Sequence, residues 1–142
     1  MLTMPLILSR TPAQRITDAG LVKILQQKAG YLDSGDVFFA AKTQSVRERL
    51  PNGNIIRITG KPVYLTVIVL LNKRGHVQCS CSCGDFKFRW EVALERKDAA
   101  EIEYSNGQPP VINNPQMVPS ACKHLVKLYQ TIQPRLAQVV RI

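Results

Sequence analysis

Two short pairs of potential metal ligands, Cys81-x-Cys83 and Cys122-x-His124, constrain the fold of this chain more than any other feature. Together they supply three thiolates and one imidazole, which is a donor set of tetrahedral zinc sites. Both members of each pair can face one ion if the first pair ends a strand and the second pair begins a helix. The sequence therefore predicts one bound Zn²⁺ that ties a β-hairpin to a final helix.

Four protein ligands leave no open coordination position, so this motif favours a structural ion and a protein that is not an enzyme. Two alternatives remain. Cys79 continues the alternation and could replace one of the two cysteines that follow it. Cys122 and His124 could instead form a nucleophile and its base, although such dyads usually join distant segments. His76 lies near a predicted turn, where we expect it to be exposed.

The length and composition of the chain are typical of one globular domain, residues 1–142, with a packed core. Hydrophobic residues make up 45% of the 142 residues, which argues against disorder. The longest apolar run, residues 63–71, falls far short of the ~20 residues that a membrane span needs. The N-terminus lacks the features of a secretory signal. We therefore expect a reducing compartment, where closely spaced cysteines are more often metal ligands than disulfides.

The net charge of +9 is concentrated in the first half of the chain. Residues 1–75 carry eleven Lys and Arg against four Asp and Glu, whereas residues 76–142 carry eight against six. Such an excess raises the affinity for any polyanion, including nucleic acid and acidic protein surfaces, without choosing among them. A solvated basic face that keeps the protein soluble explains the same numbers.

The N-terminal half predicts one helix followed by strands. Thr11 and Pro12 are suited to begin a helix, and apolar residues at helical spacing continue it to about residue 29. A shorter helix that is capped by Thr17 or Asp18 and ends at the same place is the alternative. Residues 31–53 read as a mixed loop with short ordered pieces that ends in a Pro-Asn-Gly turn. Two segments rich in β-branched residues, 54–59 and 63–71, predict strands.

The C-terminal half predicts the hairpin and two helices. Residues 76–81 resume an extended pattern after a turn, so they pair with the strand before them and deliver the cysteines. The spacing of Phe86, Trp90 and Leu94 favours a helix, and the composition of residues 95–103 favours its continuation. Four prolines keep residues 104–120 irregular, and Ser120 is suited to cap a last helix with an apolar stripe. The fold class is α+β.

The ligand pattern resembles the SWIM-type zinc finger, in which Cys-x-Cys, a variable insert and Cys-x-His bind one zinc ion on a ββα unit. The segments Cys81-Ser82-Cys83-Gly84-Asp85-Phe86 and Cys122-Lys123-His124-Leu125 carry the resemblance, including the aromatic residue three positions after the second cysteine. The resemblance covers residues 63–130 and implies nucleic-acid binding as one function. The insert, residues 84–121, is longer than is usual in that family, and residues 1–60 form an N-terminal helix and strand extension.

A further resemblance is to small zinc-finger proteins of tailed bacteriophages that occur among virion components. It is carried by the same ligand segments together with Tyr104-Ser105-Asn106-Gly107, Pro109-Pro110 and Asn114-Pro115. This resemblance implies a structural protein that is assembled into a virion in the host cytoplasm and docks on neighbouring protein subunits. A nucleic-acid-binding module is the alternative.

Overall fold

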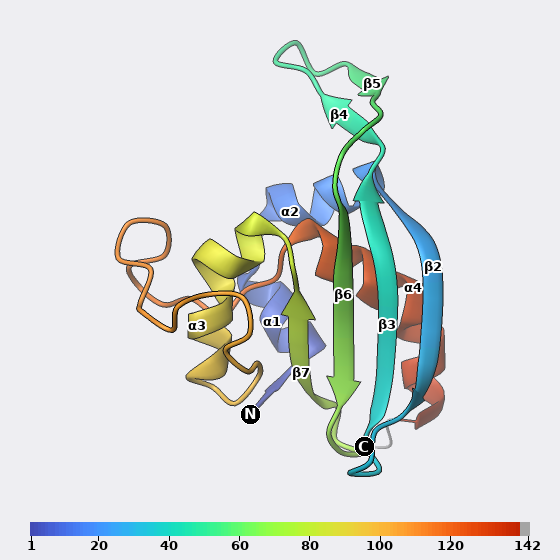
Figure 1. Ribbon diagram of the computed structural model, residues 1–142, viewed down its shortest axis with the longest axis vertical. Coiled ribbons are helices and arrows are strands. Elements are labelled where there is room, and N and C mark those ends of the chain that lie inside the picture. The colour runs from blue at the N-terminus through green and yellow to red at the C-terminus, as the bar shows by residue number, and fades with distance from the viewer. Residues whose placement is uncertain (140–142) are drawn as a thin grey trace.

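A computed structural model describes residues 1–139 of the chain, so the last three residues of the predicted domain lie outside the described residues. Helices and strands follow one another along the chain without a repeating order (Figure 1), which confirms the α+β class. The elements are β1 (Leu2–Thr3), α1 (Met4–Arg10), α2 (Ala13–Asp18), η1 (Ala19–Leu21), β2 (Val22–Tyr31), β3 (Val37–Ser45), β4 (Arg47–Arg49), β5 (Ile55–Arg57), β6 (Val63–Leu70), β7 (His76–Cys81), η2 (Phe86–Trp90), α3 (Glu91–Glu95) and α4 (Lys123–Val139).

Five antiparallel strands form the central sheet in the order β1-β7-β6-β3-β2. The two remaining strands, β4 and β5, pair only with each other. They form a ribbon that extends from one end of the sheet, beyond the rest of the molecule (Figure 1). Strands from both halves of the chain therefore share one sheet, with β6 at its centre.

Helix α4 covers one face of this sheet and contacts β2, β3, β6 and β7. Its apolar stripe is buried as predicted, and α1 adds Met4 and Ile7 to the same core. The strand side chains that point to this inner face include Phe39, Ala41 and Ile68, which are all buried. Among residues 1–139, no helix combines the length and apolar character that a membrane span requires.

The N-terminal predictions were partly wrong. A helix does begin after Pro12, but it ends at Asp18, and the expected continuation to residue 29 is the edge strand β2. A bulge between Ile24 and Gln26 shifts the register of β2 against β3. Because a bulge interrupts the two-residue alternation, the apolar positions of this strand imitate helical spacing. Thr11 does not cap α2; its hydroxyl donates to the Ile7 carbonyl oxygen.

The mixed loop with short ordered pieces predicted over residues 31–53 was also partly wrong, because these residues contain β3, a strand of 9 residues that lies between two partner strands. Pairing on both sides stabilises this strand, although its Ala-Ala-Lys stretch has a low β-propensity. Local propensity does not capture this tertiary effect. The predicted strand at 54–59 is shorter, residues 55–57, and lies in the ribbon. The strand at 63–71 and its hairpin with residues 76–81 are confirmed.

Towards the C-terminus the helix predicted from Phe86 is confirmed, although it begins with one π-helical turn and ends at Glu95. The expected continuation to residue 103 was wrong. Asp98 adopts a positive φ of 60°, and the chain turns back until the Ala99 carbonyl oxygen accepts the Cys79 amide. Residues 104–120 contain no helix or strand, as predicted. Ser120 does not cap α4, which begins at Lys123, since its hydroxyl donates to the Arg10 carbonyl oxygen.

Candidate metal centre

The four predicted ligand residues lie together where the hairpin meets the last helix. Cys81 is the last residue of β7 and Cys83 follows before η2, while Cys122 directly precedes α4 and His124 lies in its first turn. All four are buried, and their ligand atoms lie within 4.8 Å of one another. Sulfur atoms bound at about 2.3 Å to one tetrahedral ion lie roughly 3.8 Å apart. The cluster is therefore compact enough to hold a metal ion.

The imidazole of His124 supports this assignment because no other group among the described residues satisfies its hydrogen-bonding nitrogens. The residue is 3% exposed, and neither ring nitrogen has a hydrogen-bond partner among the described residues. A buried polar group without a partner costs free energy, so its presence calls for a ligand. The Tyr64 ring meets the imidazole edge to face, with centroids 5.0 Å apart, and thereby fixes its orientation.

The three thiols of the cluster compete for ionisation. Burial opposes the ionisation of Cys81, but hydrogen bonds from its two neighbouring thiols and Thr66 outweigh it and lower the pKa of this thiol well below its usual value. Burial raises the pKa of Cys122 well above its usual value, and the neighbouring sulfurs raise it further. A metal ion favours the thiolate at every sulfur at once. The cluster is thus suited to a cation.

Further hydrogen bonds reach the sulfurs from their surroundings. The Thr66 hydroxyl lies 3.5 Å from the Cys81 sulfur, and the Phe86 amide donates to the Cys83 sulfur at 3.4 Å. Such contacts stabilise thiolates and orient them towards a metal. Thr66 lies on the inward face of β6, where its hydroxyl is also 3.0 Å from the Thr43 hydroxyl.

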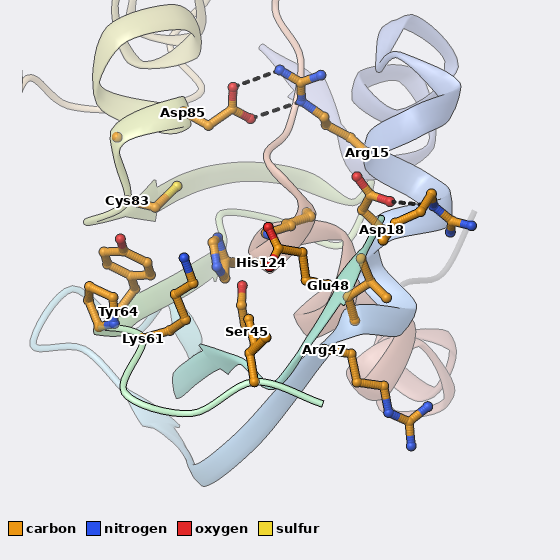
Figure 2. Close-up of a pocket in the computed structure, with 16 residues that line it drawn as sticks. Arg15, Asp18, Ser45, Arg47, Glu48, Lys61, Tyr64, Cys83, Asp85 and His124 are labelled. Atoms are coloured by element: carbon orange, nitrogen blue, oxygen red, sulfur yellow. Dashed lines mark hydrogen bonds and ion pairs between the residues drawn. The ribbon is translucent and has the colours of Figure 1, made fainter. Parts of the chain in front are cut away.

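An ion pair joins helix α2 to the segment that follows the first two ligands (Figure 2). Arg15 binds both carboxylate oxygens of Asp85, at 2.9 and 3.1 Å. The same carboxylate accepts a hydrogen bond from the Trp90 indole at 3.1 Å, and it raises the pKa of Arg15 through that hydrogen-bonded contact. The contact spans 70 residues of sequence, and no local pattern predicts it.

A cavity of about 490 Å³ opens beside the cluster. Its wall includes Cys83, Tyr64 and His124, and Lys61 lies beside Tyr64 (Figure 2). A site that can bind an ion needs an entry path, and this cavity supplies one to a centre that is otherwise enclosed by the core.

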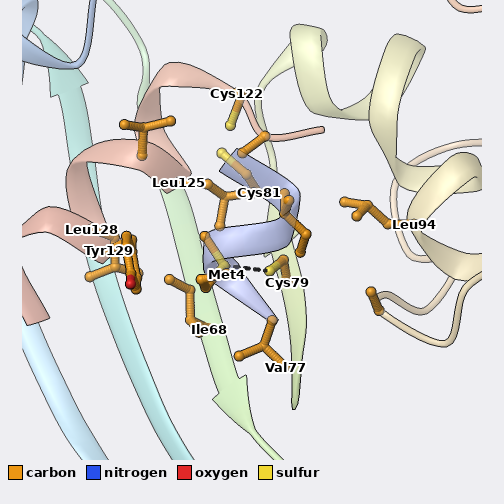
Figure 3. Close-up of a cluster of buried hydrophobic side chains, with 14 of the residues drawn as sticks. Met4, Ile68, Val77, Cys79, Cys81, Leu94, Cys122, Leu125, Leu128 and Tyr129 are labelled. Carbon is orange, nitrogen blue, oxygen red and sulfur yellow. Dashed lines mark hydrogen bonds between the residues drawn. The ribbon is translucent and has the colours of Figure 1, made fainter. Parts of the chain in front are cut away.

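The two other candidate ligands lie outside the cluster. Cys79 is buried 3.6 Å from the Met4 sulfur (Figure 3), and burial raises the pKa of its thiol to about 12. Such a thiol is protonated at neutral pH and packs as a small apolar side chain. His76 lies in the hairpin, where its Nδ1 atom is 2.9 Å from the side-chain amide nitrogen of Asn72.

The irregular segment between the ligand pairs has anchors of its own. Glu91 is fully buried, and its carboxylate accepts hydrogen bonds from the amides of residues 103, 104 and 105. Further along, the Asn114 side chain binds the carbonyl oxygens of Arg89 and Val118. This carboxylate was not among the predicted functional residues, although an acidic residue beside the apolar run of residues 92–94 was a usable signal.

Comparisons of the chain with protein-family models, with curated proteins and with solved structures find no match. The resemblances to SWIM fingers and to bacteriophage proteins therefore rest on the residues that carry them. What the geometry adds is a buried Cys₃His cluster that can hold a metal ion, as a zinc finger does.

We predict that Cys81→Ser abolishes metal binding, whereas Cys79→Ser leaves it unchanged. Cys81 belongs to the cluster and Cys79 does not, although a buried hydroxyl at position 79 is expected to cost about 1–3 kcal/mol of stability. Elemental analysis of the two variants, purified under reducing conditions, measures the metal per chain. The opposite result would move the ligand set by two residues along β7.

We also predict that Glu91→Gln loosens the start of the irregular segment without releasing metal. A neutral amide cannot replace both acceptor oxygens, and the loss is expected to be about 1–3 kcal/mol. Hydrogen exchange of the amides of residues 103–105 should become faster than in Glu95→Gln, the matched change at a partly exposed position of α3. Unchanged exchange would show that the carboxylate does not anchor the segment.

Proposed function

We propose that this chain is a non-enzymatic assembly module whose fold is stabilised by one zinc ion. Cys81, Cys83, Cys122 and His124 would hold the ion, and three thiolates with one imidazole form a complete tetrahedral set. When bound, the ion supplies cross-linking and charge neutralisation. With all four positions taken by protein, no place remains for an activated water, which supports a structural role over a catalytic one.

The observation that carries the proposal is the outer face of the central sheet, the face opposite to α4. Within residues 1–139 no helix covers the β6, β3 and β2 part of this face (Figure 1). Along β6 it presents four apolar side chains in succession, and Val63 and Leu65 are 49% and 47% exposed. The other two are Val67 and Val69, and Phe38 and Ala40 of β3 lie directly opposite them.

A continuous apolar strip of this kind differs from scattered exposed residues, which need no explanation. Contiguous apolar surface with polar borders is typical of sites where another protein binds. The strip is also rigid, since β6 pairs along its length with β3 and for much of it with β7. Rigid surfaces lose little conformational entropy on docking, which favours binding.

The charges along the strip favour a second copy of this chain as the partner. Lys42 lies on the β3 side, directly opposite Leu65. Glu101 and Glu103 lie on the β7 side, where they line a cavity of about 170 Å³ together with Leu65 and Val67. A two-fold axis parallel to the strands and above β6 would place the acidic border of one copy over the basic border of the other. Such complementarity steers and orients association.

We extend the proposal to the setting of the assembly, a tailed-bacteriophage particle formed in the host cytoplasm. Its support is the resemblance of residues 81–86, 104–107 and 122–125 to virion zinc-finger proteins. Mass spectrometry of purified particles tests this setting separately, through peptides of this chain at a fixed ratio to the major subunit.

We predict that Leu65→Asp makes the protein monomeric, whereas Leu32→Asp does not. Both leucines are exposed to a similar degree, 47% and 42%, but Leu32 lies in the β2–β3 turn, away from the strip. A charge buried in an apolar interface without a partner carries a large penalty. Sedimentation velocity over a range of concentrations should show the wild type and Leu32→Asp associating and Leu65→Asp sedimenting as a monomer.

A charge exchange tests the two-fold arrangement itself. Lys42→Glu and Glu101→Lys should each weaken self-association, because each creates repulsion between the facing borders. The double variant should recover most of the association, since the borders are again complementary. A wild type that remains monomeric at high micromolar concentration, or a double variant no stronger than either single one, would contradict the second copy as partner.

A further inference from the structure

The projecting ribbon, residues 46–58, carries a charge arrangement that its own fold does not explain. Arg47 of β4 lies directly opposite Arg57 of β5, and Arg49 lies opposite Ile55. Since side chains alternate along a strand, these three arginines share one face of the ribbon. Like charges at directly opposed positions destabilise a strand pair. The pairing of Arg47 with Arg57 therefore lowers the stability of the ribbon.

The ribbon is nevertheless ordered by its backbone. The Ile58 amide donates to the Val46 carbonyl oxygen at its base, and the Leu50 amide donates to the Asn54 carbonyl oxygen near its tip. Gly53 supplies the positive φ of 87° that closes the turn. All six residues of β4 and β5 are exposed, so the arginine face is displayed to solvent on a preformed element.

More positive charge lies at the base of the ribbon. Lys61 and Lys123 line the cavity beside the metal centre, and Arg47 extends from the rim of this cavity outward (Figure 2). Asp18 lies 3.8 Å from Arg49, and Glu48 and Asp85 line the same cavity, so these carboxylates offset part of that charge. Arg47 and Arg57 remain the directly opposed pair, on an element that projects beyond the body of the molecule (Figure 1).

We propose that the ribbon binds in the major groove of double-stranded DNA. That groove is about 12 Å wide and admits a two-stranded β-ribbon. A duplex presents rows of phosphates on both sides of the groove, so two adjacent arginines find separate partners there. Binding offsets the repulsion between Arg47 and Arg57, which an isolated ribbon leaves uncompensated. This site is separate from the outer face of the sheet, and either can be wrong while the other holds.

The test compares two double variants that remove the same charge. Arg47→Gln/Arg57→Gln changes the ribbon, whereas Lys73→Gln/Arg74→Gln changes the β6–β7 turn at the opposite end of the sheet. Fluorescence anisotropy with a labelled 20-base-pair DNA duplex measures the affinity of each protein over a series of salt concentrations. The ribbon variant should bind several-fold more weakly, and its slope of log affinity against log salt should fall by about 2. The control should keep a slope close to that of the wild type.

Three further measurements make the test decisive. The melting temperature of the ribbon variant should be equal to or higher than that of the wild type, because opposed charges have been removed. An RNA duplex should bind more weakly than DNA, since its major groove is deep and narrow. Polyglutamate, a stand-in for an acidic protein, should bind more weakly still and with no preference for the intact ribbon.

The proposal is overturned if the wild type does not bind the DNA duplex at low salt, or if both double variants lose the same affinity. It is also overturned if RNA or polyglutamate binds as tightly as DNA. The Leu65→Asp variant should bind DNA like the wild type per chain, which separates failure of the ribbon site from failure of self-association.

Discussion

Three cysteine sulfurs and one imidazole lie close together within the core. The rest of the structure depends on how their charges and hydrogen-bonding groups are satisfied. The sulfurs cannot all ionise together without a cation, because burial and mutual repulsion raise the pKa of Cys122 while Cys81 ionises. The imidazole has no hydrogen-bond partner among the described residues. In the proposed holoprotein, one zinc ion resolves both problems and joins the end of β7 to the start of α4. Structural zinc contributes about 10 kcal/mol or more in small finger peptides, which is comparable with the whole stability of many domains.

Contacts outside the cluster stabilise the other parts of the structure, and each part has its own set of contacts. Asp85 connects the ligand segment to α2 through Arg15, so the residues around the cluster also hold α2 in place. The side chains of Glu91 and Asn114 hold the irregular insert by hydrogen bonds to its backbone, and the insert therefore does not depend on the metal alone. The central sheet has its own apolar core. The apolar strip lies on this sheet, whereas the arginine ribbon is a separate two-stranded element that projects from one end of it (Figure 1).

The sequence predicted which residues form the buried Cys₃His cluster better than it predicted the fold around that cluster. Ligand identity and spacing are local and chemically specific, so Cys81, Cys83, Cys122 and His124 could be grouped without knowing the fold. The edge strand β2 was mistaken for a helix because its bulge breaks the alternation of residues 22–31. Contacts such as Tyr64 on His124 and Arg15 on Asp85 join segments 60 and 70 residues apart, and only the folded chain brings them together.

If a bound zinc ion stabilises this fold, as we claim, the free energy of unfolding must differ between the protein with the ion and the protein without it. Protein purified under reducing conditions would be unfolded in denaturant as isolated and after zinc is removed by a chelator, with elemental analysis of both samples. We expect one zinc per chain in the first sample and a loss of several kcal/mol in the second. Re-addition of zinc should restore the original unfolding curve. Coincident unfolding curves, with zinc present in one sample and absent from the other, would contradict the claim.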